Sequence, residues 1–225
     1  MSHARRPVTD DVITVGLRRA VVGGLLVVLA IVLGIMIAVE VDPLDIDTWW
    51  NGAVSVSAGA LTQLALALNF LGGGWFATYL VPLGGCLLLA LFGRWRAGLF
   101  FLSASALSAA VVQVLKTVFG RVRPEDMLVI SDHGSYPSGH AANAATIAVV
   151  ALVLLPRAWV AVVGGAWVFA MAFSRTQVHA HWFSDTVGGV LVGAGMALMV
   201  AGLFTVALLR ESAARESLAK ERSLG

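Results

Sequence analysis

The sequence predicts an all-α polytopic membrane protein: a bundle of six transmembrane helices with an interfacial amphipathic helix between the first two spans. Hydrophobic residues make up 59% of the 225-residue chain and charged residues only 12%, about half the ~25% of a typical soluble protein. A soluble domain of this length cannot bury so much apolar surface, because much of any folded surface faces water. The composition therefore excludes a soluble enzyme, a disordered chain and, with Cys86 as the one cysteine, a disulfide scaffold.

Six apolar segments approach the length of a membrane span. A helix needs about 20 apolar residues to cross the hydrocarbon core, and the fourth and fifth segments are short by this measure. The first segment is too long for a signal-peptide core and has no clear cleavage site, so we expect it to be retained. The predicted spans are Ala20–Val39, Trp75–Phe92, Ala97–Val118, Ser138–Leu155, Ala158–Phe173 and Asp185–Leu209.

The segment between the first two spans, Trp49–Leu71, is only moderately apolar. Its second half places five apolar side chains on one helical face, which is typical of a helix that lies in the membrane surface. We therefore predict an interfacial helix here. The apolar face consists of Leu61, Leu64, Ala65, Leu68 and Leu71.

The placement of basic residues favours six spans over seven. Cytoplasmic loops are enriched in Lys and Arg, and six spans with an inner N-terminus leave 11 of the 15 basic residues inside. A seventh span at Trp49–Leu71 would place eight basic residues on one side of the membrane and seven on the other, which removes the bias. The predicted inner residues are Arg5, Arg6, Arg18, Arg19, Arg94, Arg96, Arg157, Arg210, Arg215, Lys220 and Arg222.

The chain is expected to form a single membrane-embedded domain over residues 1–225, with a core of about 20–209. The tails 1–19 and 210–225 would be cytosolic, and the protein would be a multi-pass protein of the cell membrane. The bilayer is the expected partner. The sequence has no signature of nucleic-acid binding and gives no evidence of an obligate protein partner.

Four basic residues remain on the outer side against the charge bias: Lys116, Arg121, Arg123 and Arg175. They cluster beside histidines, and ionisable groups at membrane depth indicate a functional site by default. Snorkelling of a side chain at a helix end would account for Lys116 alone. The cluster therefore predicts an anionic ligand on the outer side.

Three stretches contain these residues: Lys116–Pro124, Tyr136–His140 and Ser174–Asp185. In order and spacing they resemble the three signature motifs of the type 2 phosphatidic acid phosphatase superfamily, integral membrane enzymes whose pocket is shared with vanadium-dependent haloperoxidases and bacterial acid phosphatases. Val122 is a mild departure, because many bacterial members have proline there. The pattern specifies eleven positions, all met: Lys116, Arg123, Pro124, Pro137, Ser138, Gly139, His140, Ser174, Arg175, His181 and Asp185.

The residue types in these motifs suit a phosphate ester, whose negative charge spreads over three oxygens during transfer. Lys116, Arg123 and Arg175 can hold those oxygens. Ser138 and Gly139 stand at a predicted helix start, where free backbone N–H groups bind anions, the hydroxyl adds a donor and glycine permits close approach. No metal-ligand constellation is evident, so neither a metal nor another cofactor is expected.

Two histidines and a carboxylate complete the predicted site. His181 and Asp185 are four residues apart and share a helical face, so Asp185 can accept a hydrogen bond from one ring nitrogen. The other nitrogen is then free to attack phosphorus. His140 would donate a proton to the leaving oxygen and later activate water. The resemblance implies the same roles for these positions.

Other polar residues are weaker candidates. His179 is expected to be a wall or interface residue, and Arg121 either a phosphate or head-group contact or a solvated side chain. Asp132 and His133 are expected to face solvent. The remaining candidates have structural interpretations: interhelical hydrogen bonds for Gln113 and Asn143, packing for Cys86, and a flexible joint for Gly72–Gly74.

Residues and resemblance together predict a metal-independent lipid phosphatase that acts at the outer leaflet through a phosphohistidine. The layout resembles bacterial members acting on polyprenyl (undecaprenyl-type) diphosphate, phosphatidylglycerophosphate or phosphatidate, and analogy alone favours the first. A lipid phosphotransferase would share every motif. A non-catalytic anion binder or transporter is disfavoured by the set of His140, His181 and Asp185, and a soluble haloperoxidase by the six spans.

Overall fold

The computed structural model consists of helices and their connections, and no β-strand occurs within the described residues 10–40, 42–54, 59–131 and 133–224. The predicted all-α class is therefore confirmed. Residues 76–80 form a short π-helix that leads directly into the next α-helix. In chain order the elements are α1 Asp10–Val39, α2 Asp45–Ala53, α3 Ala60–Gly72, η1 Phe76–Leu80, α4 Val81–Leu91, α5 Trp95–Phe119, α6 Gly139–Leu154, α7 Ala158–Gln177 and α8 Phe183–Leu224.

Each of the six predicted spans overlaps a helix. Four helices in the described part of the chain, α1, α5, α7 and α8, are long and apolar enough to cross a membrane. The pair formed by α3 and η1–α4 qualifies as a fifth only when taken together, with a bend of 47°. Helix α6 is apolar but has 16 residues. The protein is thus a multi-pass membrane protein with four or five candidate spans, and the sixth span stays a prediction.

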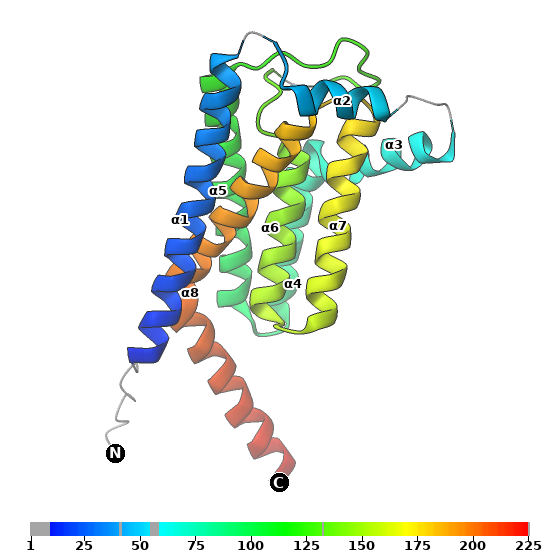
Figure 1. Ribbon diagram of the computed structural model, residues 1–225. Helices are drawn as coiled ribbons and strands as arrows, with labels where there is room; N and C mark the ends of the chain where they lie inside the picture. Colours follow the sequence, from blue (N-terminus) through cyan, green and yellow to red (C-terminus); the bar gives the residue numbers. More distant parts are fainter. Residues whose placement is uncertain (1–9, 41, 55–58, 132, 225) are drawn as a thin grey trace.

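The segment Trp49–Leu71 contains parts of two helices, α2 and α3, where one interfacial helix was expected. Residues 55–58 between them lie outside the described part of the chain. Trp50 of α2 packs its ring against Phe173 and Phe183, at centroid distances of 6.4 and 5.1 Å. This packing holds α2 across one end of the bundle, whereas α3 projects to its side (Figure 1).

The helices alternate in direction, so the connections gather at two ends (Figure 1). The α4–α5 and α6–α7 connections lie at the same end as the start of α1 and the end of α8. The α5–α6 and α7–α8 connections lie at the opposite end, beside α2. Because the motif residues lie in these two connections and in the helix turns next to them, the fold brings the three motifs together at one end of the bundle.

Small residues allow α1 and α8 to pack with their backbones in close contact. A Cβ atom added to Gly23 would overlap the carbonyl of Gly195 and the backbone of Met199. Close backbone approach at glycines is a common way for helices to associate in membranes. This contact fixes the long helix α8, which carries Asp185 in its first turn.

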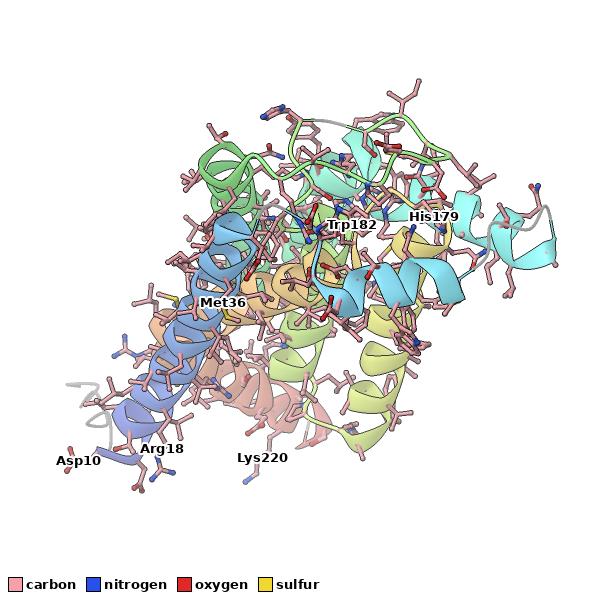
Figure 2. All side chains as sticks on the ribbon, turned by 45° about the horizontal axis from the view of Figure 1, so that its top comes forward. Asp10, Arg18, Met36, His179, Trp182 and Lys220 are labelled. Carbon is pink, nitrogen blue, oxygen red and sulfur yellow. The ribbon has the colours of Figure 1, made fainter. Side chains whose placement is uncertain are left out.

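The two ends of the bundle differ in the residues that lie there. Asp10, Arg18 and Lys220 lie at one end, while His179 and Trp182 lie at the other (Figure 2). The turns that contain Arg94 and Arg157 belong to the first end (Figure 1). Arg5 and Arg6 fall outside the described residues. The arrangement agrees with a clustering of basic residues at one end, and the side of the membrane that this end faces stays a prediction.

Candidate active site

The first motif follows the end of α5. Lys116 lies in the last turn of α5 and is buried, and Gly120 ends the helix in the left-handed conformation, with φ of 54°. The chain then turns back over the bundle. Lys116 Nζ and Arg123 Nη2 both donate to the carbonyl oxygen of Gly134, at 2.8 and 2.9 Å. One backbone carbonyl therefore holds two of the predicted phosphate-binding cations side by side.

The second motif forms the start of α6, as predicted. Ser138 is the N-cap, and its backbone N–H donates to the backbone carbonyl of Asp185 at 2.9 Å. The buried Oγ atom of Ser138 has no hydrogen-bond partner among the described residues. Tyr136 donates from its hydroxyl to the carbonyl of Ala30 at 2.5 Å. Burial raises the pKa of Tyr136, which keeps this donor protonated.

The third motif spans the end of α7 and the start of α8. Arg175 is buried in the last turn of α7 and donates from Nη1 to the side-chain oxygen of Asn69 at 2.6 Å. His181 lies in the connection, and Asp185 lies in the first turn of α8. Both are buried.

His181 is held by a backbone carbonyl. Its Nδ1 atom lies 2.8 Å from the carbonyl oxygen of Ser135, and its Nε2 atom lies 3.2 Å from Arg123 Nη1. A carbonyl oxygen only accepts and a guanidinium only donates. Nδ1 therefore carries the proton, and Nε2 presents its lone pair toward Arg123. Arg123 is fixed in turn by the carbonyl of Ala180, at 2.5 Å.

Asp185 acts on His181 less directly than the four-residue spacing predicts. The distance from His181 Nδ1 to Asp185 Oδ2 is 3.6 Å, which is too long for a hydrogen bond. Asp185 instead accepts from the hydroxyl of Ser135 and from the backbone N–H of Trp182, the latter at 2.9 Å. The carboxylate therefore stabilises the loop whose carbonyl orients the imidazole.

His181 lies outside the helices and is buried, and burial lowers its pKa to about 4, although the nearby Asp185 carboxylate opposes the shift. Arg175 and Arg123 lower the pKa further. At neutral pH the imidazole is therefore uncharged. A neutral imidazole with an available Nε2 lone pair is the form that can act as a nucleophile.

His140 lies in the first turn of α6, opposite the end of α3. Its Nε2 atom lies 3.0 Å from the carbonyl oxygen of Asn69. Because a carbonyl only accepts, Nε2 carries a proton and can serve as a donor. Asn69 thus contacts both His140 and Arg175, through its main chain and its side chain respectively.

A cavity of about 960 Å³ joins five of the eight predicted site residues: Lys116, Gly139, His140, Arg175 and His181. Gln113 and Asn143, expected to make interhelical hydrogen bonds, also line it. Arg123 lines an adjacent cavity and reaches the site through its contact with His181. The rest of the larger cavity is largely apolar, with contributions from Phe70, Trp75, Phe76, Tyr79, Leu83 and Leu102.

Arg121 is not solvated, which was one of the two environments expected for it, and it lines the same adjacent cavity as Arg123. Its guanidinium donates to Asp185 Oδ1 at 2.5 Å and to Asp47 Oδ2 at 2.7 Å, and its side chain is 9% exposed. It is therefore neither solvated nor a lining residue of the cavity that contains Lys116. Asp47 was not among the predicted site residues, because no local pattern indicates a partner 74 residues away.

Two weaker candidates, His179 and His133, do not line the cavity that contains His181. His179 is buried, with Nδ1 2.5 Å from Asp126 and Nε2 2.9 Å from the carbonyl of Val54, so it is an interface residue as predicted. His133 is exposed, and Asp132 lies outside the described residues. In the described part of the chain no three His, Cys, Asp or Glu side chains are placed to hold one metal ion.

The sequence matches the PAP2 superfamily over residues 97–207, a range that contains all three motifs. This segment is a PAP2 superfamily domain. This is the type 2 phosphatidic acid phosphatase family that the motifs resemble.

Several known phosphatases are similar to this chain in structure or in sequence. The crystal structure of a transmembrane PAP2-type phosphatidylglycerolphosphate phosphatase from Bacillus subtilis has the same fold, with a TM-score of 0.70 at 24% identity, over 80% of this PAP2 chain and 94% of that one. A lipid A 1-phosphatase of Rhizobium johnstonii is 29% identical over 51% of this chain and 50% of its own length. An undecaprenyl-diphosphatase of Sulfolobus acidocaldarius is 29% identical over 50% of this chain and 58% of its own length. The chain thus spans about half the length of these curated relatives.

Proposed function

We propose that this protein is a membrane lipid phosphatase that hydrolyses a lipid phosphate or diphosphate through a phosphohistidine on His181. One observation carries the proposal. The proton on Nδ1 of His181 is committed to the carbonyl of Ser135, which leaves the Nε2 lone pair beside Arg123. His140, Lys116 and Arg175 line the same cavity as His181.

The reaction takes two steps. In the first, Nε2 of His181 attacks phosphorus, the bond from phosphorus to the leaving oxygen breaks, and His140 gives its Nε2 proton to that oxygen. In the second, His140 removes a proton from water, the water oxygen attacks phosphorus, and the nitrogen–phosphorus bond breaks to release phosphate. His140 starts the first step with a proton on each ring nitrogen, and the two steps together return both histidines to their starting protonation states.

Fixed donors stabilise the charge that develops on the phosphoryl oxygens. Lys116 and Arg123 of the first motif and Arg175 of the third supply three positive charges. Ser138 supplies a buried hydroxyl without a partner among the described residues, at the first turn of α6 with Gly139. Preorganised donors in a site shielded from water are among the largest contributions to catalysis.

An apolar cavity wall supports a lipid as the substrate. Phe70, Trp75, Tyr79 and Leu83 line the cavity and remain more than half exposed, at 58, 63, 62 and 56%. A lipid tail in the bilayer could cover these side chains while the head group enters beside His181. The name of the Sulfolobus acidocaldarius relative supports a polyprenyl diphosphate as the substrate, and those of other relatives support phosphatidylglycerophosphate or lipid A.

The same proposal includes a topology. Six spans with cytoplasmic termini would place the candidate site on the extracytoplasmic side and α2 and α3 near the outer membrane surface. The clustering of basic residues at the end opposite the site supports this orientation. Cys86, the one cysteine, can be moved by mutation to either end and tested for labelling by an impermeant thiol reagent in intact cells.

The deciding experiment measures phosphate release from a panel of polyprenyl diphosphate, phosphatidylglycerophosphate, phosphatidate and lipid A in detergent with EDTA. Wild type should release phosphate from at least one lipid, and His181→Ala should reduce the rate by at least about 10³-fold. His133→Ala, at an exposed histidine, is the matched control. Equal rates for wild type and His181→Ala would refute the mechanism.

Labelled phosphate distinguishes hydrolysis from transfer. Label that appears in inorganic phosphate supports a hydrolase, and label on an acceptor lipid would make the protein a phosphotransferase. A phosphorylated His181 trapped without acid would exclude a non-catalytic binder, because binding alone forms no covalent bond.

A further inference from the structure

A buried chain of charges links helix α2 to the candidate active site. The Arg121 guanidinium donates from Nη2 to Asp47 Oδ2 at 2.7 Å and from Nη1 to Asp185 Oδ1 at 2.5 Å. The side chains of Asp47 and Asp185 are both 0% exposed. One guanidinium therefore joins a carboxylate of α2 to the carboxylate beside His181.

Asp47 also holds the start of α8 directly. Its Oδ1 atom accepts from the backbone N–H of Ser184 at 2.8 Å, and its Oδ2 atom accepts from the Ser184 hydroxyl at 2.7 Å. The Arg121 guanidinium donates to the same hydroxyl oxygen at 2.8 Å. Asp185 is the next residue, so Asp47 restrains its position both through the backbone and through Arg121.

The contacts continue from Asp185 to the nucleophile. Asp185 accepts from the hydroxyl of Ser135, and the carbonyl of Ser135 accepts from His181 Nδ1 at 2.8 Å. The order of contacts is therefore Asp47, Arg121, Asp185, Ser135 and His181. A displacement of Asp185 would move the carbonyl that sets the direction of the Nε2 lone pair.

We propose that Asp47 is a positioning residue for the reaction, acting through Arg121 and the first turn of α8 on the orientation of His181. This inference rests on the function proposed above. Held between two carboxylates, Arg121 stays out of the cavity that contains Lys116 and Arg175. Its contacts with the two carboxylates and the Ser184 hydroxyl assign it to ordering the nucleophile.

The test compares kcat and KM for the lipid of the panel that is hydrolysed fastest. Asp47→Asn should lower kcat by about 10- to 100-fold, as expected for loss of a contact that orients the nucleophile through other residues, with KM within about twofold of wild type. Asp45→Asn is the matched control, because Asp45 is an exposed aspartate in the same helix turn. It should leave both constants unchanged. Unchanged kcat in Asp47→Asn would overturn the proposal.

A double variant distinguishes a loss of activity caused by misfolding from one caused by the lost contact between Asp47 and Arg121. Removing one partner of a buried ion pair is destabilising because a charge stays buried alone. Arg121→Gln combined with Asp47→Asn removes both charges. If Asp47 acts through Arg121, Asp47→Asn should lower kcat by less than about threefold further in the Arg121→Gln background. Losses that multiply independently would refute the coupling.

Chemical modification tests the orientation of His181 without any turnover. Diethyl pyrocarbonate acylates neutral imidazole, and mass spectrometry reads each histidine separately. At pH 7 the modification rate of His181 should change by at least about threefold in Asp47→Asn, while that of the exposed His133 stays constant. Equal rates at His181 in both proteins would overturn the inference. If wild type released no phosphate from any lipid, the proposed function would fail, while this measurement would still decide the role of Asp47.

Discussion

The Nδ1 atom of His181 lies 2.8 Å from the carbonyl oxygen of Ser135 but 3.6 Å from Asp185. The backbone of one loop, and not the carboxylate four residues along the chain, sets the tautomer of the candidate nucleophile. A carbonyl keeps its role as acceptor at every pH at which the protein is folded. Asp185 acts on the orientation of the imidazole through Ser135, to whose hydroxyl it is hydrogen-bonded.

The burial of His181 predicts a specific dependence of stability on pH. Burial lowers the pKa of His181 to about 4 in the folded protein, against about 6.5 in the unfolded chain. Between these values the unfolded chain binds a proton that the folded protein does not, so the free energy of unfolding falls as the pH is lowered from about 6.5 to about 4. In thermal unfolding in detergent, wild type should lose more stability than His181→Gln between pH 7 and pH 4.5. Equal losses would contradict a buried neutral imidazole.

Arg123→Lys should lower kcat by about 10²-fold. One guanidinium reaches the carbonyls of Gly134 and Ala180 while it faces Nε2 of His181. A lysine ammonium cannot keep these three directions at once, so the charge would persist without the geometry. Phosphate release checks the effect, with Arg157→Lys at the exposed far end as control. Full activity in Arg123→Lys would show that charge alone suffices.

Gly73→Ala should impair the proton transfer assigned to His140. A Cβ atom at Gly73 would overlap the imidazole ring of His140, whereas one at Gly84 would meet nothing within 4 Å. The ring must move, and the expected loss in kcat approaches the ~10²-fold contribution of a displaced general acid. Gly84→Ala is the matched control in α4. If both variants were equally active, the position of His140 would be unimportant for the reaction.

Asn69→Asp should raise KM more than it lowers kcat. The side-chain oxygen of Asn69 accepts from Arg175 Nη1 at 2.6 Å. A carboxylate at this point would bind the guanidinium more strongly and compete with the substrate phosphate, for an expected increase in KM of about 10-fold. Asn51→Asp in α2 serves as the control for an added negative charge near the same end. A fall in KM would contradict the assignment of Arg175 as a phosphate ligand.

The sequence could predict the helices and the motif residues because their signals are local. Long apolar runs predicted helices that overlap α1, α5, α7 and α8, and the spacing of Lys116, His140 and His181 indicated one pocket. Asp47 and Asn69 were missed because their partners lie 74 and 106 residues away.

The role of Ser135 was missed for a different reason. It orients His181 with a backbone carbonyl, which every residue possesses. The placement of α2 was missed because Trp50 packs against Phe173 and Phe183, more than 120 residues away, which apolar periodicity along Trp49–Leu71 does not encode.

Helix α1 lies outside the segment that matches the family model, yet other parts of the fold depend on contacts with it. Similarity to the family begins at residue 97, yet Tyr136 needs Ala30 as its acceptor and α8 needs the glycine surface of α1. A fragment cut at the start of the recognisable homology would leave a buried hydroxyl unsatisfied beside the second motif. Helix α1 is therefore part of the structure that supports the candidate site, and not merely an anchor.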